Sequence, residues 1–367
     1  MRILMIVSND VIHDGRVLKE GRALHAAGHE VAFLGWDRSG RLPARAEWEG
    51  MPIHRVRTDG AMRLLPNDVF RNPVWWRRAY RLARTLPWDV VHCHDLDTLP
   101  VGVRLKRRTS RPLVYDCHEV FGYMIEEDVP SFVTGYAFRM ERRLAPQADR
   151  IIAVNPAVQT YVEAVAGRSS VVVSNCEEVT PGPYVPPGGP PFTVTYIGTL
   201  HKSRFVLEAI DVVASMPDVR LVLGGSKALA DTVRERCARQ ANTTFLGEVP
   251  RDRVMPLTRA GHAVLSMFDP ALRINRVGFP NKIYEAMAAG RPSLVTKGLP
   301  MAALVEANEC GLAVPYTREG LRDALVRLRD EPGLADRLGR NGREAAVREF
   351  NWAAESRKLV ALYGELG

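Results

Sequence analysis

The chain has 367 residues, of which 46% are hydrophobic and 25% are charged, and its formal net charge is +8. This composition is that of an ordinary globular protein, and the length suits two domains of about 150–200 residues. No apolar run reaches the ~18 residues of a membrane-spanning helix, and we expect a cytoplasmic protein. The five cysteines show no CxxC spacing, so we expect neither a zinc knuckle nor a disulfide framework.

Short apolar runs alternate with amphipathic stretches through the first 175 residues. A helix is predicted over residues 16–27, where apolar residues recur at helical spacing until Gly28 ends the pattern. The alternation is typical of βαβ units in a doubly wound parallel sheet. The predicted strands cover residues 2–8, 30–35, 51–56, 89–93, 112–116, 150–154 and 170–173.

Residues 176–191 interrupt this alternation with six prolines and three glycines. Such a density excludes a helix or a central strand and predicts a linker between domain 1–175 and a second domain, 192–350. Residues 351–367 form a final amphipathic helix that we expect to pack back on the first domain. The fold class is therefore α/β, with two Rossmann-like doubly wound sheets facing a cleft. Strands of the second domain are predicted at 192–198, 219–224, 243–246, 262–267 and 292–296.

A basic band runs from Arg55 to Arg111, with 13 basic and 5 acidic residues. Within it, Trp75, Ala79, Leu82 and Leu86 form an apolar stripe opposite several arginines. The pattern fits a helix packed on a sheet, which we favour, and equally one that lies on an anionic membrane surface. Peripheral contact with the inner face of a membrane therefore stays open. Nucleic-acid binding is not expected, because no nucleic-acid motif accompanies the band.

The segment GFPNKIYEAMAAGR, residues 278–291, is the most informative. Pro280 suits the first turn of a helix, and the free amides near Asn281 and Lys282 would attract an anion such as a diphosphate. Glu285 follows about one turn later, where its carboxylate can accept hydrogen bonds from ribose hydroxyls. The alternative is a capped surface helix in which this glutamate only complements the helix dipole.

A second segment, TYIGTLHKSRF, runs from a predicted strand into a basic turn. Gly198 allows close backbone approach, while Lys202 and Arg204 can neutralise phosphate oxygens. Basic loop residues are also often simply solvated. Both segments lie at strand-to-helix corners of one domain, which favours a shared anion site.

The N-terminal domain places polar residues at corresponding corners. Gly15 lies at the first strand-to-helix turn, His94 and Asp95 end the strand VVHCHD, and His118 and Glu119 end VYDCHE. We favour substrate contact or proton handling over a metal site, because the strand-end partners of the histidines are spread out. The sequence has no GxSxG elbow, no Walker loop and no GxGxxG in the first turn.

Taken together, the segments resemble retaining glycosyltransferases of family 4, which have the GT-B fold. The resemblance covers essentially the whole chain. Its landmarks are DGRVLKEGRALHAAGHEV, DVVHCHDLDTLP, LVYDCHE, YIGTL followed by Arg204, FLGEVP and FPNKIYEAMAAGRPSLV.

The resemblance implies catalytic roles for three residues. Glu285 matches the ribose-binding glutamate, Arg204 a cation on the donor diphosphate, and His118 a histidine near the transferred sugar. The acceptor-side candidates are His94, Asp95 and Glu119. The implied donor-binding residues are Gly15, Gly198, Thr199, Lys202, Gly247, Glu248, Val249, Pro280, Asn281 and Lys282.

Two positions depart from the family pattern. Val277 stands where many members have a glutamate that contacts the donor sugar, and Thr199 where an arginine is usual. Some phosphate contacts would then come from Lys202 or Lys282.

The implied reaction moves a sugar from a nucleotide diphosphate sugar to an acceptor hydroxyl with retained configuration, without a metal or cofactor. A UDP-sugar is favoured and a GDP-sugar comes next, and the acceptor is a glycan, a lipid-linked glycan or a small molecule. Two alternatives stay open. One is a nucleotide-sugar 2-epimerase with Glu119 as acid or base, and the other is a catalytically silent nucleotide-binding module, which Val277 and Thr199 would suit.

Overall fold

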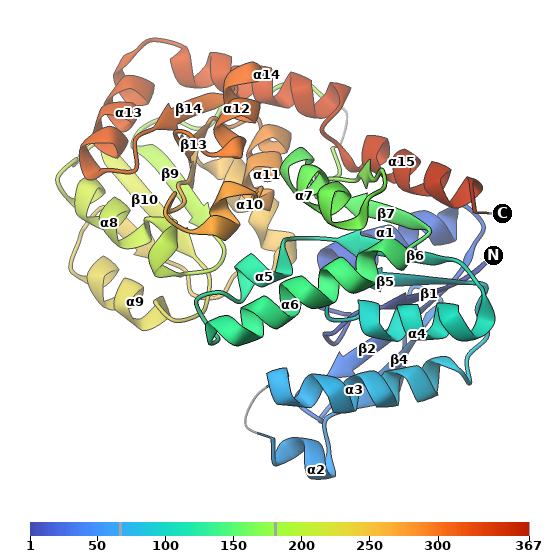
Figure 1. The fold of residues 1–367 in the computed structure, drawn as a ribbon. Coiled ribbons are helices and arrows are strands. Elements are labelled where there is room, and N and C mark those ends of the chain that lie inside the picture. The colour runs from blue at the N-terminus through green and yellow to red at the C-terminus, as the bar shows by residue number, and fades with distance from the viewer. Residues whose placement is uncertain (66–67, 180–181, 367) are drawn as a thin grey trace. The chain divides into compact units, whose positions relative to one another are not determined.

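A computed structural model describes residues 1–65, 68–179 and 182–366. The chain forms two compact units, which are described separately (Figure 1). Unit 1 comprises Met1–Ser174 and Glu355–Gly367, and unit 2 comprises Asn175–Ala354.

Unit 1 is built on an eight-stranded sheet in the order β3-β4-β2-β1-β5-β6-β7-β8. All neighbours run parallel except β3 and β4, which pair antiparallel. The strands are β1 (Arg2–Ile6), β2 (Glu30–Asp37), β3 (Arg45–Trp48), β4 (Met51–Arg57), β5 (Val90–His94), β6 (Leu113–Cys117), β7 (Arg150–Ala153) and β8 (Val171–Val172). The seven strands predicted for this half are thus confirmed, and β3 is an additional edge strand.

The helices of unit 1 connect successive parallel strands. They are α1 (Gly15–Ala26), α2 (Gly60–Arg63), α3 (Asp68–Ala83), α4 (Leu99–Thr109), α5 (Phe121–Met124), α6 (Ser131–Leu144), η1 (Ala145–Gln147) and α7 (Pro156–Ala166). Asp14 caps α1, its carboxylate accepting a hydrogen bond from the Val17 amide at 3.2 Å.

Three of the four residues of the apolar stripe, Trp75, Ala79 and Leu82, lie on α3 and face the core, and Leu86 packs on the same core just after the helix ends. Trp75 and Ala79 are fully buried, and Trp75 stacks on Trp36 of β2 with ring centroids 5.5 Å apart. On the same helix, Arg78 pairs with Asp59 at 2.6 Å. The predicted packed helix is confirmed, so this stripe is not available to a membrane surface. Among the described residues, no helix combines the length and the apolar character needed to cross a bilayer.

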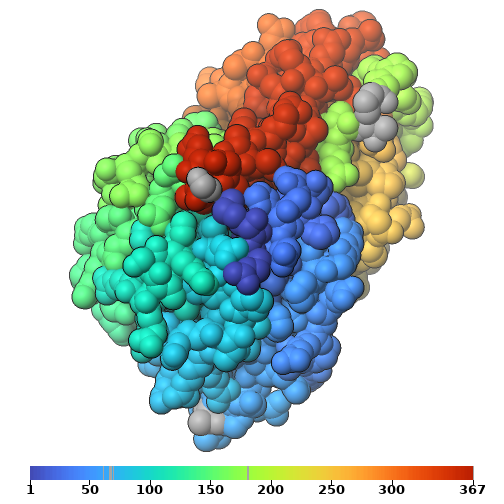
Figure 2. All heavy atoms as spheres, turned by 90° about the vertical axis from the view of Figure 1, so that its right-hand side faces the viewer, coloured from blue at the N-terminus to red at the C-terminus, as the bar shows by residue number. Residues whose placement is uncertain are grey.

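The C-terminal helix α15 (Trp352–Gly364) brings the chain back to unit 1. Tyr363 is fully buried, and the Glu355 carboxylate accepts a hydrogen bond from the Ser174 amide at 2.9 Å. Arg150 pairs with Glu365 at 3.2 Å. Figure 2 shows this segment, in red, lying against the blue N-terminal segment.

Unit 2 holds a six-stranded parallel sheet in the order β11-β10-β9-β12-β13-β14. Five of its strands match the predicted ones, and β14 is additional. They are β9 (Phe192–Ile197), β10 (Val219–Gly224), β11 (Thr243–Phe245), β12 (Ala263–Ser266), β13 (Ser293–Thr296) and β14 (Gly311–Val314). The expected fold class, two doubly wound parallel-sheet α/β domains, is confirmed.

The remaining helices belong to unit 2 and surround its sheet. They are η2 (Lys202–Arg204), α8 (Val206–Ala214), α9 (Ala230–Ala238), α10 (Arg251–Ala260), η3 (Arg273–Arg276), α11 (Asn281–Ala289), α12 (Pro300–Ala307), α13 (Arg318–Asp330) and α14 (Leu334–Arg348).

The described part of the expected linker, residues 176–179 and 182–191, also belongs to unit 2. Tyr184 donates a hydrogen bond to Asp336 at 2.9 Å, and the buried Arg291 guanidinium donates to the Val185 carbonyl at 2.9 Å. Side chains of unit 2 therefore hold this proline-rich segment in place.

Candidate functional site

Glycines, which leave the backbone without side chains, lie at the carboxyl ends of three neighbouring strands of unit 2, β9, β10 and β11. The Gly198 amide donates to the Gly224 carbonyl at 2.9 Å, and the Gly225 amide donates to the Gly247 carbonyl at 2.7 Å. Gly225 has φ +147°, and a Cβ there would lie 1.8 Å from the Gly198 carbonyl oxygen. A residue with a side chain does not fit at Gly225, where the two backbone segments approach each other. A ligand at these strand ends would therefore meet backbone atoms.

Two cations lie beside these strand ends. The Arg204 guanidinium stacks 3.9 Å from the ring centroid of Phe268 and donates to Asn275 at 3.4 Å. The Lys282 ammonium lies 4.6 Å from the ring centroid of Tyr196. Aromatic rings under both cations hold them at the end of β9, where an anion would meet them.

Helix α11 and the residue before it carry three donor candidates, Pro280, Asn281 and Lys282, together with Glu285. Pro280 is the N-cap with an extended backbone, so the expectation that it lies in the first turn is wrong by one position. Asn281 begins the helix, and Glu285 lies four positions on. Gly290 ends the helix in the left-handed conformation with φ +69°, as predicted.

The other donor residues predicted in unit 2 follow strands β9 and β11. Thr199 and Lys202 are exposed after β9, and the Thr199 carbonyl accepts a 2.5 Å hydrogen bond from Tyr196. Gly247 and Glu248 follow β11, and Val249 packs where a Cβ on Gly224 would lie 2.5 Å from its methyl group.

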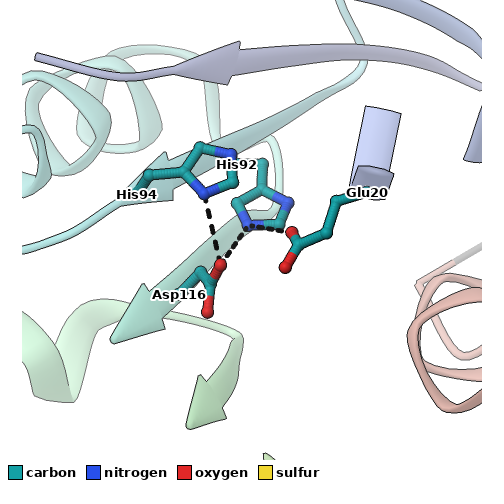
Figure 3. Close-up of side chains that lie close together, drawn as sticks. All are labelled: Glu20, His92, His94 and Asp116. Carbon is teal, nitrogen blue, oxygen red and sulfur yellow. Dashed lines mark hydrogen bonds and ion pairs between the residues drawn. The ribbon is translucent and has the colours of Figure 1, made fainter. Parts of the chain in front are cut away.

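Unit 1 gathers a second polar group at the ends of β5 and β6 (Figure 3). The fully buried Asp116 carboxylate accepts bonds from Arg16 at 2.8 and 3.1 Å and lies 2.7 Å from His118 Nε2. It also lies 3.2 Å from His94 Nδ1. Asp95 approaches His118 from the other side, its Oδ2 lying 3.3 Å from His118 Nδ1.

Both ring nitrogens of His118 therefore face carboxylates. Burial alone would lower the pKa of His118, but Asp95 and Asp116 outweigh it and raise that pKa well above its usual range. Burial likewise opposes ionisation of Asp116, yet the charges of Arg16 and His118 hold its pKa well below the usual range. The group thus keeps His118 as an imidazolium.

Asp95 carries a further sign of a functional position. Its φ is +62°, in the left-handed region that a residue with a side chain rarely adopts. Its side chain is 27% exposed, whereas Asp116 is fully buried. Asp95 is thus the carboxylate of this group that a ligand can reach.

Two further buried residues extend the group. His92 Nδ1 lies 2.8 Å from the Tyr363 hydroxyl, and Glu20 Oε1 lies 2.9 Å from Arg16 Nε. Burial is the main cause that raises the pKa of Glu20 to about 8, against the opposing charge of Arg16. Burial also lowers the pKa of His94 to about 3. At neutral pH the group therefore holds a protonated Glu20 and a neutral His94.

Glu20, His92, His94 and Asp116 are close enough to share a cation, since each offers a ligand atom within 4.8 Å of the others. The Arg16 guanidinium already lies against both carboxylates, 2.9 Å from Glu20 and 2.8 Å from Asp116. A divalent ion would bring further positive charge beside this buried guanidinium and would have to displace the proton of Glu20. These residues therefore fit a metal only if Arg16 moves away.

The three catalytic candidates are divided between the units, His118 in unit 1 and Arg204 with Glu285 in unit 2. Of the unit 1 candidates, Gly15 begins α1, and Glu119 follows the end of β6 with partial exposure. Glu20, Tyr363 and Gly225 contribute to these sites without having been predicted from the sequence. Only for Gly225 did the sequence hold a signal, a glycine pair directly after the apolar run VRLVL.

Two family models match the chain, Glycosyltransferase Family 4 over residues 16–176 and Glycosyl transferases group 1 over residues 191–331. The glycogen synthase of Mycobacterium tuberculosis is 23% identical in an alignment 372 residues long, which covers 93% of this chain and 88% of that protein. The sucrose-phosphate synthase from Thermosynechococcus elongatus has a similar structure, with a TM-score of 0.80, 19% identity and coverage of 100% and 99% of the two chains. Anabaena Alr3699/HepE in complex with UDP-glucose has a TM-score of 0.71 and 17% identity over all of both chains. The chain belongs to the family 4 type of glycosyltransferases and has their GT-B fold.

Proposed function

We propose that this glycosyltransferase takes its sugar from a nucleotide diphosphate sugar, with UDP-sugars favoured over GDP-sugars. The observation that carries the proposal is the pair of cations, Arg204 and Lys282, beside the bare backbone of Gly198. A diphosphate offers several oxygens to such cations and to backbone amides. The HepE structure with UDP-glucose supports the choice of uridine for the base.

In the proposed reaction, the bond between the sugar and the distal phosphate breaks, and negative charge grows on the departing phosphate. Arg204 and Lys282 would stabilise that charge, and loss of one such group commonly costs about 2.7–4 kcal/mol of transition-state stabilisation. Glu285 would accept hydrogen bonds from the ribose. We further propose that the anomeric configuration is retained, as the family resemblance implies, and that no metal takes part.

The group around His118 supplies the sugar-facing side of the proposal. An imidazolium fixed between Asp95 and Asp116 provides a permanent positive charge, while Asp95 keeps lone pairs within reach of a ligand hydroxyl. His94, Asp95 and Glu119 are the proposed contacts of the acceptor, a hydroxyl of a glycan, a lipid-linked glycan or a small molecule. We propose a cytoplasmic location. Peripheral contact with a membrane, through the exposed arginines between Arg55 and Arg111, stays a prediction.

The test is release of nucleoside diphosphate from UDP-glucose, GDP-mannose and ADP-glucose, with and without a panel of glycan acceptors. Glu285→Ala and Arg204→Ala should strongly reduce acceptor-dependent release, whereas Glu306→Ala, on the exposed side of α12, should retain it. The anomeric proton of the product, read by NMR, decides retention. Conversion of a nucleotide sugar without any acceptor would favour the 2-epimerase instead, and tight binding without turnover would favour a silent binding module.

A further inference from the structure

A cavity of about 500 Å³ lies in unit 2, between the proline-rich segment 182–188 and the ends of two helices. Cavities of about 300–1,000 Å³ are the usual size of small-molecule sites. The last turns of α10 and α11, the loop before β13 and helix α14 supply the rest of its lining, which consists of Arg259, Ala288, Ala289, Arg291 and Arg343. No aspartate or glutamate occurs among the described residues of the lining, so the three arginines alone give it charge.

This cavity is separate from the donor site proposed above. It adjoins Ala288 at the C-terminal end of α11, whereas Asn281 and Lys282 lie at the N-terminal end. Seven residues of helix separate Asn281 from Ala288, a rise of about 10 Å. Arg291 also precedes β13, at the amino end of that strand, while the donor candidates lie beyond the carboxyl ends of β9 and β11. A ligand in the cavity would therefore leave the donor site open.

Arg291 holds the cavity wall together and brings a buried positive charge to it. It is 2% exposed, and its guanidinium donates to the carbonyls of Val185, Gly261 and Gly290 at 2.9, 2.7 and 2.9 Å. None of the described carboxylates lies within ion-pair distance of it, although the charge of Asp336 acts on it from further away. A buried charge without a direct counter-ion favours an anion beside it.

Arg259 and Arg343 bring two further charges to the same cavity. Arg343 is half-buried and donates to the Ala288 carbonyl at 2.7 Å, whereas Arg259 is exposed at the end of α10. Burial is the main cause that lowers the pKa of Arg291 and of Arg343, and the charge of Arg259 lowers both further. The three guanidiniums are thus close enough to repel one another, and an anion between them would relieve that repulsion.

The rest of the lining indicates what the anion carries. Three of the seven residues in segment 182–188 are prolines, which offer carbonyl oxygens but no amide hydrogen. Carbonyl oxygens accept hydrogen bonds from hydroxyl groups. A phosphate monoester, with a charge of about −1.5 to −2 at pH 7, matches several guanidiniums better than a carboxylate does.

We propose that this cavity binds the phosphate monoester of a sugar. Arg259 and Arg343 would contact the phosphate, Arg291 would add its charge from the wall, and the carbonyls of segment 182–188 would accept hydrogen bonds from the sugar hydroxyls. The proposal concerns a second ligand of the chain, and it does not depend on the donor or on the reaction proposed above.

The experiment is calorimetric titration of the full chain with glucose 6-phosphate, compared with glucose and with inorganic phosphate. Glucose 6-phosphate should bind more tightly than inorganic phosphate, and glucose should not bind. The affinity for glucose 6-phosphate should fall as the salt concentration rises, because ions screen the arginines. Arg204→Ala should leave this affinity unchanged, since Arg204 belongs to the donor site.

Arg259→Ala should weaken the binding of glucose 6-phosphate at least about tenfold, as expected for loss of charge-assisted hydrogen bonds. Because Arg259 is exposed, its removal should leave the Tm unchanged, which distinguishes a lost ligand contact from a lost fold. Arg343→Met should weaken binding to a similar extent. The matched control is Arg337→Ala, an exposed arginine on the same helix α14 but outside the lining, which should leave the affinity unchanged.

Three results would overturn the proposal. The first is absence of glucose 6-phosphate binding at millimolar concentrations, and the second is binding that Arg259→Ala weakens no more than Arg337→Ala does. The third is binding that Arg204→Ala abolishes, which would place the ligand in the donor site. Equal affinities for glucose 6-phosphate and inorganic phosphate would overturn the contacts between the sugar and segment 182–188.

Discussion

The Asp116→Asn substitution tests the buried group of unit 1. Asp116 is fully buried, and it pairs with Arg16, whose side chain is 4% exposed, through two hydrogen bonds of 2.8 and 3.1 Å. Asparagine keeps the shape but removes the charge, which leaves the buried guanidinium without this counter-charge. Breaking a buried pair in this way costs about 3–5 kcal/mol. For a domain of 150–250 residues this corresponds to a fall of about 6–20 °C in Tm.

The matched control is Glu49→Gln. Glu49 makes an equally close pair with Arg22, at 2.6 and 2.7 Å, but both side chains are nearly half exposed. Such a pair contributes about 0–1 kcal/mol. Urea unfolding followed by tryptophan fluorescence suits the comparison, because five of the six tryptophans lie in unit 1. An Asp116→Asn chain that unfolds no earlier than Glu49→Gln would refute the reasoning from burial.

Three further predictions concern single residues. Glu285→Ala should weaken UDP binding by about 1–3 kcal/mol through lost hydrogen bonds, and an unchanged calorimetric affinity would contradict its assigned role. In the folded chain Glu20 has a pKa of about 8, against an ordinary 4.5. The contribution of its buried proton to the free energy of unfolding is therefore complete below pH 4.5, and it is lost as the pH rises through 8. The unfolding free energy of Glu20→Gln should therefore fall less steeply over pH 5–8, by up to about 1.4 kcal/mol per pH unit, and parallel pH profiles would argue against a buried proton. Gly225→Ala should lower the Tm of unit 2 and weaken UDP binding, because the new Cβ would lie 1.8 Å from the Gly198 carbonyl oxygen. An unchanged Tm would show that the two backbone segments can move apart without loss of stability.

The sequence predicts those elements whose apolar pattern is local. The last four residues of β1, Ile3 to Ile6, are buried and form a continuous apolar run in the sequence. The glycines that end α1 and α11 mark the boundaries of these helices. Strand β3 was missed because its four residues, RAEW, alternate between exposed and half-buried positions without an apolar run. Strand β14 begins with a glycine, and its two central residues are only half-buried, whereas all four residues of the equally short β12 and β13 are buried.

Some residues of the candidate site could likewise be predicted from the sequence, and others could not. Strand-end residues such as His118 and Arg204 could be found because parallel strands bring their carboxyl ends to one edge of the sheet. Their partners could not be found, because Asp116 meets Arg16 across 100 residues of sequence and His92 meets Tyr363 across 271. Only tertiary packing creates those pairs, and with them the protonation states of the group.

The most direct measurement is a crystal structure of the chain with UDP at saturating concentration. We predict a diphosphate within hydrogen-bond distance of Arg204 and Lys282, next to the backbone of Gly198, and a ribose hydrogen-bonded to the Glu285 carboxylate. A nucleotide bound elsewhere, or a diphosphate that touches neither cation, would contradict the donor site proposed for unit 2.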